Sequence, residues 1–144
     1  MDKNKVLILD FGGQYSQLIA RRIREFNVYS MIKSYRIKSE EVKQIDPIAI
    51  IFSGGPNSVT SENAPKIDPE ILKLDIPILG ICYGMQLMAQ MMPGGKVKKA
   101  QQGEYGKAKL NIDNNIGILK DIENNTQVWM SHGDQVVKMP DSFE

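Results

Sequence analysis

One stretch of the sequence decides the fold: Ile76-Pro77-Ile78-Leu79-Gly80-Ile81-Cys82-Tyr83-Gly84-Met85-Gln86-Leu87-Met88-Ala89-Gln90-Met91-Met92. Its first part, 76–81, is a short apolar run typical of a strand, and its last part, 85–92, is a methionine-rich helical segment. Gly80 and Gly84 lie two positions either side of Cys82, and they remove the Cβ atoms that would clash in a tight bend. The stretch therefore predicts a strand, a sharp turn carrying Cys82, and a helix.

The same alternation of strand-like and helix-like segments runs through the residues before this stretch. The expected strands are Val6 to Asp10, Val28 to Ile32 and Ile48 to Phe52, and the expected helices are Gln14 to Phe26, a short helix capped by Ser39 with Glu40 and Glu41 in its first turn, and Glu70 to Leu74 after Pro69. Strand-helix repetition predicts an α/β fold with a doubly wound parallel sheet. Because the strands are continuously apolar, we expect the sheet to be buried on both faces.

The character of the sequence changes after Gly95. Lys107 to Ile112 and Thr126 to Met130 read as short strands, Val136 to Met139 as a further one, and asparagine-rich turns separate them. No long helix separates these strands. We therefore expect an antiparallel extension in the C-terminal part of the chain.

Composition excludes several classes of function. The chain has 144 residues, about the length of one domain, and 18 Lys and Arg against 17 Asp and Glu leave a formal charge of +1. Such a balance offers no field for nucleic acid or for an anionic membrane surface. The apolar run near the start is too short for a membrane span and lacks a signal-peptide layout, so we expect a cytoplasmic location. A single cysteine excludes an internal disulfide and a multi-cysteine metal site.

The setting of Cys82 favours a reactive thiol. A strand-to-helix turn with flanking glycines is the layout of a nucleophile elbow, which lifts the nucleophile above the sheet. At a helix N-terminus, exposed N–H groups and the helix dipole stabilise a thiolate. The alternative is a buried structural cysteine, which the flanking glycines disfavour.

A thiol that attacks an amide also needs hydrogen-bond donors for the oxyanion of the tetrahedral intermediate. The candidates are the N–H of Tyr83, next along the turn, and an N–H from the loop Ser53-Gly54-Gly55-Pro56, which leaves the neighbouring strand. The alternative for that loop is an ordinary turn before a helix.

These motifs together resemble the class I glutamine amidotransferase family, which carries a G-x-C-x-G-x-Q elbow and a glycine-rich oxyanion loop upstream of it. Further stretches are similar to the GMP synthetase branch of that family, and they run in order from residue 5 to about residue 140. They are Ile8-Leu9-Asp10-Phe11-Gly12-Gly13-Gln14-Tyr15, Ser53-Gly54-Gly55-Pro56-Asn57-Ser58-Val59, Gly103-Glu104-Tyr105-Gly106 and Val128-Trp129-Met130-Ser131-His132-Gly133-Asp134-Gln135-Val136.

The resemblance implies a flavodoxin-like three-layer sandwich and the hydrolysis of glutamine to glutamate and ammonia. It implies that Cys82 is the catalytic nucleophile and forms a glutamyl thioester. The other residues that it assigns are Gly55 and Tyr83 for the oxyanion and Gln86, Ser131, Gly133 and Asp134 for glutamine.

It also implies a division of labour with a synthetase domain. That ATP-pyrophosphatase domain, absent from this sequence, would bind ATP and Mg, adenylate XMP and aminate it to GMP with the ammonia. We expect glutamine as the ligand of this domain, no cofactor within it, no nucleic-acid or membrane partner, and a homodimer formed through the absent part.

The family's catalytic triad is completed by a His-x-Glu pair downstream of the Ser-His-Gly-Asp motif. The chain has one histidine, His132, and no His-x-Glu. We reject His132 and Asp134 as a substitute dyad, because Trp129 to Asp134 matches the pocket motif in full. We interpret residues 1–144 as an amidotransferase domain that is incomplete at its C-terminus. Two expectations follow: little or no glutaminase activity of the chain alone, and a poorly closed core without a high, cooperative melting transition.

Three alternatives stay open. Cysteine elbows also occur in flavodoxin-like peptidases and chaperones, although these lack a Ser-Gly-Gly-Pro loop combined with Gln86. A regulatory module that binds glutamine without hydrolysing it is consistent with the missing base. Amidotransferases serving another acceptor are near competitors, against which the Asp10-Phe11-Gly12-Gly13-Gln14 start and the Trp129 to Asp134 run argue.

Overall fold

A four-stranded parallel sheet forms the centre of the fold. The computed structural model describes residues 4–143. Its strands are β1 (Lys5–Asp10), β2 (Tyr29–Ser34), β3 (Ala49–Phe52) and β4 (Ile78–Gly80), in the order β2-β1-β3-β4. All three strand pairs are parallel. This order is that of flavodoxin-like sheets, so the predicted α/β class and the parallel sheet are confirmed.

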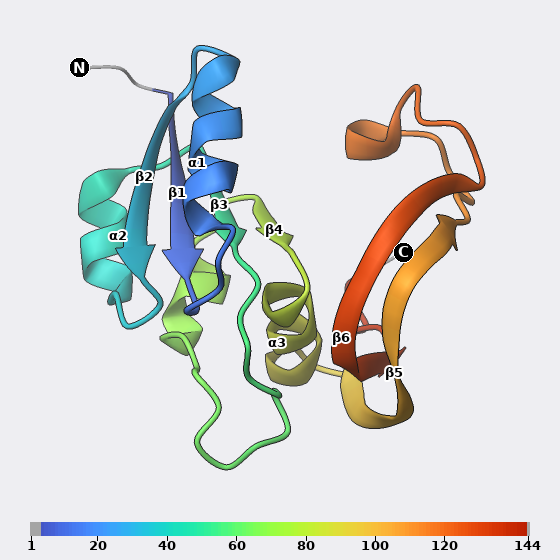
Figure 1. Ribbon diagram of the computed structural model, residues 1–144. Coiled ribbons are helices and arrows are strands. Elements are labelled where there is room, and N and C mark those ends of the chain that lie inside the picture. Colours follow the sequence, from blue (N-terminus) through green and yellow to red (C-terminus); the bar gives the residue numbers. More distant parts are fainter. Residues whose placement is uncertain (1–3, 144) are drawn as a thin grey trace.

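Helices cover both faces of the sheet, which gives three layers (Figure 1). One face carries α1 (Ser16–Glu25), which packs on β1 and β2. The other carries α2 (Ser39–Ile45), the 3₁₀-helix η1 (Pro69–Lys73) and α3 (Tyr83–Met91). Arg22 and Arg24 lie in the last turn of α1, where they complement the helix dipole.

Strand β1 shows how the apolar runs build two cores. Leu7 and Leu9 pack into the larger cluster, beneath α2, η1 and α3, while Val6 and Ile8 pack into the smaller one, beneath α1. The expected burial of both faces is therefore confirmed for β1. It is wrong at β4, where Leu79 is 41% exposed, because α1 covers the opposite edge of that face.

Two long strands make the C-terminal part. β5 (Lys96–Leu110) and β6 (Thr126–Lys138) pair antiparallel, with a register shift between Lys99 and Glu104, and the short 3₁₀-helix η2 (Gly117–Leu119) lies in their connection. The predicted antiparallel extension is confirmed. The separate short strands are wrong, because β6 runs through residues 131–135, which are polar or glycine, and continues on both sides of the register shift. Helix α3 lies between the sheet and this ribbon (Figure 1).

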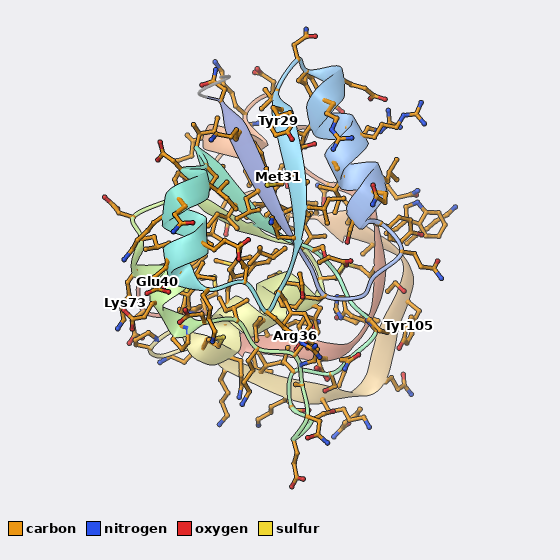
Figure 2. All side chains as sticks on the ribbon, turned by 90° about the vertical axis from the view of Figure 1, so that its left-hand side faces the viewer. Tyr29, Met31, Arg36, Glu40, Lys73 and Tyr105 are labelled. Atoms are coloured by element: carbon orange, nitrogen blue, oxygen red, sulfur yellow. The ribbon has the colours of Figure 1, made fainter. Side chains whose placement is uncertain are left out.

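The cap predicted for α2 also needs correction. Ser39 is the first helical residue, it is fully buried, and its hydroxyl makes no capping hydrogen bond. Its backbone N–H instead donates to the Asp68 carboxylate at 3.0 Å, and the N–H of Glu70 donates to the same side chain at 3.1 Å. Asp68 therefore caps η1 and supplies the acceptor that α2 lacks. Helix α2, which carries Glu40, and η1, which carries Lys73, lie on the same side of the molecule, away from Tyr105 of β5 (Figure 2).

None of the helices formed by residues 4–143 combines the length and the apolar character needed to cross a membrane.

Candidate functional site

Cys82 occupies a strained turn between β4 and α3. Its backbone angles are φ 50° and ψ −111°, a combination that side-chain-bearing residues rarely adopt. The residue is exposed, and α3 begins at the next position. Its carbonyl accepts the first helical bond, from the N–H of Gln86 at 3.0 Å. The sharp strand-to-helix turn expected from the sequence is therefore present, with the thiol at a helix N-terminus.

The two flanking glycines allow this turn to pack closely. A Cβ built on Gly80 would lie 2.7 Å from the backbone N of Met85, and one on Gly84 would lie 2.3 Å from the carbonyl oxygen of Phe52. Both contacts are with backbone, which cannot rotate away. The glycines thus press the turn against β3 and against the start of α3.

The loop Ser53 to Pro56 follows β3 and lies beside the turn. A Cβ built on Gly54 would lie 3.5 Å from the Cβ of Cys82, and one on Gly55 would lie 2.7 Å from the carbonyl oxygen of Phe11. The loop therefore fits between Cys82 and the segment after β1. Within residues 4–143, the N–H groups of Gly55 and Tyr83 have no hydrogen-bond acceptor, so both are available to a ligand.

The Ser53 side chain fixes the start of this loop by hydrogen bonds. The side chain is buried, and its hydroxyl oxygen accepts from the Phe11 N–H at 3.3 Å and from the Ser16 hydroxyl at 3.2 Å. The Ser53 hydroxyl donates to the carbonyl of Gly54 at 3.1 Å. The segments that follow β1 and β3 thus meet at the carboxyl edge of the sheet, where such sheets bind their ligands.

Asp134 on β6 connects the ribbon to this edge. Only 4% exposed, its carboxylate accepts from the Ser58 hydroxyl at 2.9 and 2.7 Å and from the Val59 N–H at 2.9 Å. Its backbone carbonyl accepts from the side-chain amide of the buried Gln86 at 3.0 Å. From its position alone, Gln86 could have been a solvated side chain and Asp134 one that merely caps a turn. The structure shows neither, because both side chains are buried and hydrogen-bonded.

These elements enclose a cavity of about 540 Å³ at the junction of sheet and ribbon. That is a volume suited to a small molecule. All seven candidate site residues line it, namely Cys82, Gly55, Tyr83, Gln86, Ser131, Gly133 and Asp134. The fold therefore brings to one cavity a set of residues that lie on separate segments of the sequence.

Other lining residues were not identified as site residues from the sequence. They are Gly12 to Tyr15, Ser58, Lys99 and Tyr105, among others. The segment after β1 could have been found, because it follows a parallel strand whose carboxyl end meets the same edge as Cys82. Lys99 and Tyr105 could not, since their place depends on the long pairing of β5 with β6.

His132 lies on the same strand as Asp134 but has a different partner. Its Nε2 atom is 3.5 Å from a carboxylate oxygen of Glu104, the residue opposite it on β5. The bonds of the Asp134 carboxylate go to Ser58 and Val59 instead. Residues 132 and 134 therefore do not form a hydrogen-bonded His-Asp dyad.

Tyr83 contributes a second, buried feature. Burial raises the pKa of its phenol to about 12, and the negative charges of an ionised Tyr35 and of Asp134 add to the shift. The hydroxyl donates to the carbonyl of Pro65. The phenol of Tyr83 therefore remains neutral at ordinary pH and serves as a buried structural group.

The chain is similar to a known protein family and to curated proteins. The model of the family "Glutamine amidotransferase class-I" matches residues 7–144. The chain is 60% identical over 144 residues to a glutamine-hydrolysing GMP synthase of Halothermothrix orenii, covering all of this chain and 28% of that protein. It is 57% identical over 143 residues to one of Nostoc punctiforme, covering 99% of this chain and 26% of that protein. The chain thus spans about a quarter of the length of the curated relatives it matches.

Solved structures share the fold. A Thermoplasma acidophilum protein, described as one subunit of a GMP synthase, superposes with a TM-score of 0.82 at 29% identity, over 96% of this chain and 69% of that one. A glutamine amidotransferase from Thermotoga maritima gives 0.70 at 21% identity, over 94% and 63% of the two chains. Because the family model matches nearly the whole length of this chain, the chain belongs to the class I glutamine amidotransferases.

Proposed function

We propose that this chain is the glutaminase part of a GMP synthase and that Cys82 is its nucleophile. The observation that carries the proposal is the strained, exposed Cys82 at a helix N-terminus, facing a cavity lined by the whole predicted site. Strained backbone conformations of this kind cluster at active sites.

In the proposed reaction the Cys82 thiolate attacks the side-chain amide carbon of glutamine. A C–S bond forms, the carbonyl π electrons move to oxygen, and collapse of this intermediate breaks the C–N bond. The leaving nitrogen takes a proton and departs as ammonia. Water then hydrolyses the glutamyl thioester, which gives glutamate and restores the thiol.

The oxyanion of both tetrahedral intermediates would accept from the N–H groups of Gly55 and Tyr83. Both N–H groups are free within residues 4–143, and the glycine loop lies against the turn that carries Cys82. Donors fixed in place before the reaction stabilise developing charge without reorganisation.

The remaining residues would bind the amino-acid end of glutamine. Ser131 and Gly133 line the cavity from β6, and Gln86 lines it from α3. Asp134 would accept from the ammonium of glutamine. A carboxylate has about four acceptor sites, and the three short contacts from Ser58 and Val59 leave room for one more donor.

The GMP synthases that this chain resembles are glutamine-hydrolysing by name. We propose that ammonia made here passes to a synthetase domain of the same protein, which binds ATP and Mg²⁺, adenylates XMP and aminates it to GMP. Dimerisation would occur through that domain. An amidotransferase serving another acceptor would share the same glutaminase chemistry.

The sequence favours one second candidate, a glutamine-binding module without hydrolysis. The chain has one histidine and no His-x-Glu pair, and His132 faces Glu104. We therefore expect little turnover of glutamine by these 144 residues alone. Turnover that disappears in His132→Ala would show instead that His132 is the base.

The first experiment is covalent labelling of Cys82 by diazo-oxo-norleucine, a reactive glutamine mimic, followed by mass spectrometry. Stoichiometric labelling that glutamine blocks, and that Cys82→Ala abolishes, supports a formed glutamine pocket with an activated thiolate. Labelling by ordinary thiol reagents alone would refute a working glutamine site.

A further inference from the structure

Asp134 holds three parts of the site together. It lies on β6, its carboxylate bonds the loop after β3 at Ser58 and Val59, and its carbonyl bonds Gln86 on α3. These are the ribbon, the oxyanion loop and the helix that follows the nucleophile. The orientation of this one side chain is therefore set mainly by Ser58 and Val59.

The Ser58 hydroxyl makes the closest of these contacts. It lies 2.9 and 2.7 Å from the two carboxylate oxygens of Asp134, and 2.8 Å from the hydroxyl of Thr60. Since Ser58 has one hydroxyl proton, which it gives to Asp134, the Thr60 hydroxyl is the donor to Ser58. The serine is half-buried and lines the cavity, and no step of the proposed reaction uses it.

The chemistry of these partners matters. The donors, a hydroxyl and a backbone N–H, are neutral, and within residues 4–143 no Lys or Arg forms an ion pair with Asp134. Such donors fix the direction of the carboxylate without pairing its charge, and Lys99, opposite Asp134 on β5, forms no ion pair with it in the described part of the chain. A fixed carboxylate without an ion-pair partner at the cavity wall suits a ligand cation.

We propose that Ser58 is a positioning residue that orients the Asp134 carboxylate toward the ammonium of glutamine, an inference that rests on the function proposed above. Without the hydroxyl, the carboxylate keeps its charge but loses the contacts that fix its rotation. Ser58 thus contributes to recognition of the amino group and not to the attack on the amide.

The experiment compares two ligands by titration calorimetry on the 144-residue chain. One is glutamine, and the other is 4-carbamoylbutanoate, which is glutamine with hydrogen in place of the ammonium. The variants are Ser58→Ala, the conservative Ser58→Thr, and Ser61→Ala as an exposed serine of the same loop. We expect Ser58→Ala to weaken glutamine about fivefold, because the freed Asp134 carboxylate must then be immobilised when the ammonium binds. Affinity for 4-carbamoylbutanoate should change less than about twofold. Ser58→Thr should restore glutamine binding, and Ser61→Ala should change nothing.

An equal loss for both ligands would show that Ser58 only supports the loop, and would overturn the proposal, as would unchanged glutamine affinity in Ser58→Ala. If the wild-type chain binds neither ligand, the proposed function itself fails, a result separate from any variant. Melting curves establish that each variant is folded. If Ser58→Ala does not fold, Ser58→Cys, with a similar volume and a weak donor, decides the same comparison.

Discussion

Replacing Gly84 with alanine tests how the turn around Cys82 is held in place. Gly84 is buried, and its N–H donates to the carbonyls of Ser53 at 3.2 Å and Ile81 at 3.0 Å. An added Cβ would lie 2.3 Å from the carbonyl oxygen of Phe52 and 2.5 Å from its Cβ. Restoring ordinary contact requires a separation of about 1 Å more, and both sides are fixed by backbone. Helix α3 must therefore move away from β3.

Two opposing effects decide whether Gly84→Ala raises or lowers the free energy of unfolding. Alanine in place of glycine within a helix gains up to about 1 kcal/mol from propensity. Overpacking of a buried site costs about 1–3 kcal/mol and more where backbone must shift. The clash is the larger effect, so we expect a net loss of roughly 2 kcal/mol. For a chain of this length that lowers the melting temperature by roughly 5–8 °C.

The assay is thermal unfolding followed by circular dichroism, together with the rate of Cys82 labelling by diazo-oxo-norleucine. Labelling should slow, because Cys82 directly precedes the moved helix and would change its place in the cavity. Gly133→Ala is the matched control for stability, since its Cβ would meet only the Tyr105 hydroxyl, at an ordinary 3.6 Å. A Gly84→Ala variant that melts at or above the wild-type temperature would refute close packing as the reason for this glycine.

Three further predictions concern strain, pH and capping. Cys82→Gly should be about 1 kcal/mol more stable than Cys82→Ala in denaturant unfolding, because the strain that glycine relieves at these φ and ψ values exceeds the extra entropy that glycine loses on folding; equal stability would mean that the turn is unstrained. Above pH 10 the free energy of unfolding should fall until about pH 12, because the raised pKa of Tyr83 makes the folded state bind more protons than the unfolded state; Tyr83→Phe should lose this dependence. Backbone hydrogen bonds from Ser39 and Glu70 hold the pKa of Asp68 below its usual value, so their contribution should be lost as pH falls below that value. Asp68→Ala should lower the melting temperature at neutral pH and remove this acid dependence, and an unchanged acid profile would contradict the capping role.

The parallel sheet and the turn at Cys82 were predictable because their signals are local. Each strand of the sheet is a compact apolar run, and the glycines beside Cys82 permit only a tight bend. The predicted Ser39 cap was wrong for the opposite reason. The Ser39 N–H donates to Asp68, which lies 29 residues away, and local preferences carry no information about such a contact.

The ribbon shows the same limit on a larger scale. Its strands are mostly exposed, so β6 can run through the polar residues 131–135. A strand is recognised in a sequence by its apolar residues, and this segment has none. The sequence therefore predicted strands only where apolar residues cluster. Ser58 belongs to one of the motifs but was not predicted as a site residue, because its importance depends on Asp134, 76 residues further along.

The placement of Asp134 joins these observations. The parallel sheet alone brings together the proposed nucleophile, the proposed oxyanion loop and the segment after β1, all of which follow the carboxyl ends of its strands. In the proposed function, β6 adds Asp134 to that edge to hold the amino-acid end of glutamine. A single buried carboxylate, bonded to Ser58, Val59 and, through its carbonyl, Gln86, fixes β6 there. In the proposed function the chemistry lies on the sheet and the recognition of glutamine on the ribbon, so changes at Gly84 and at Ser58 should affect the two separately.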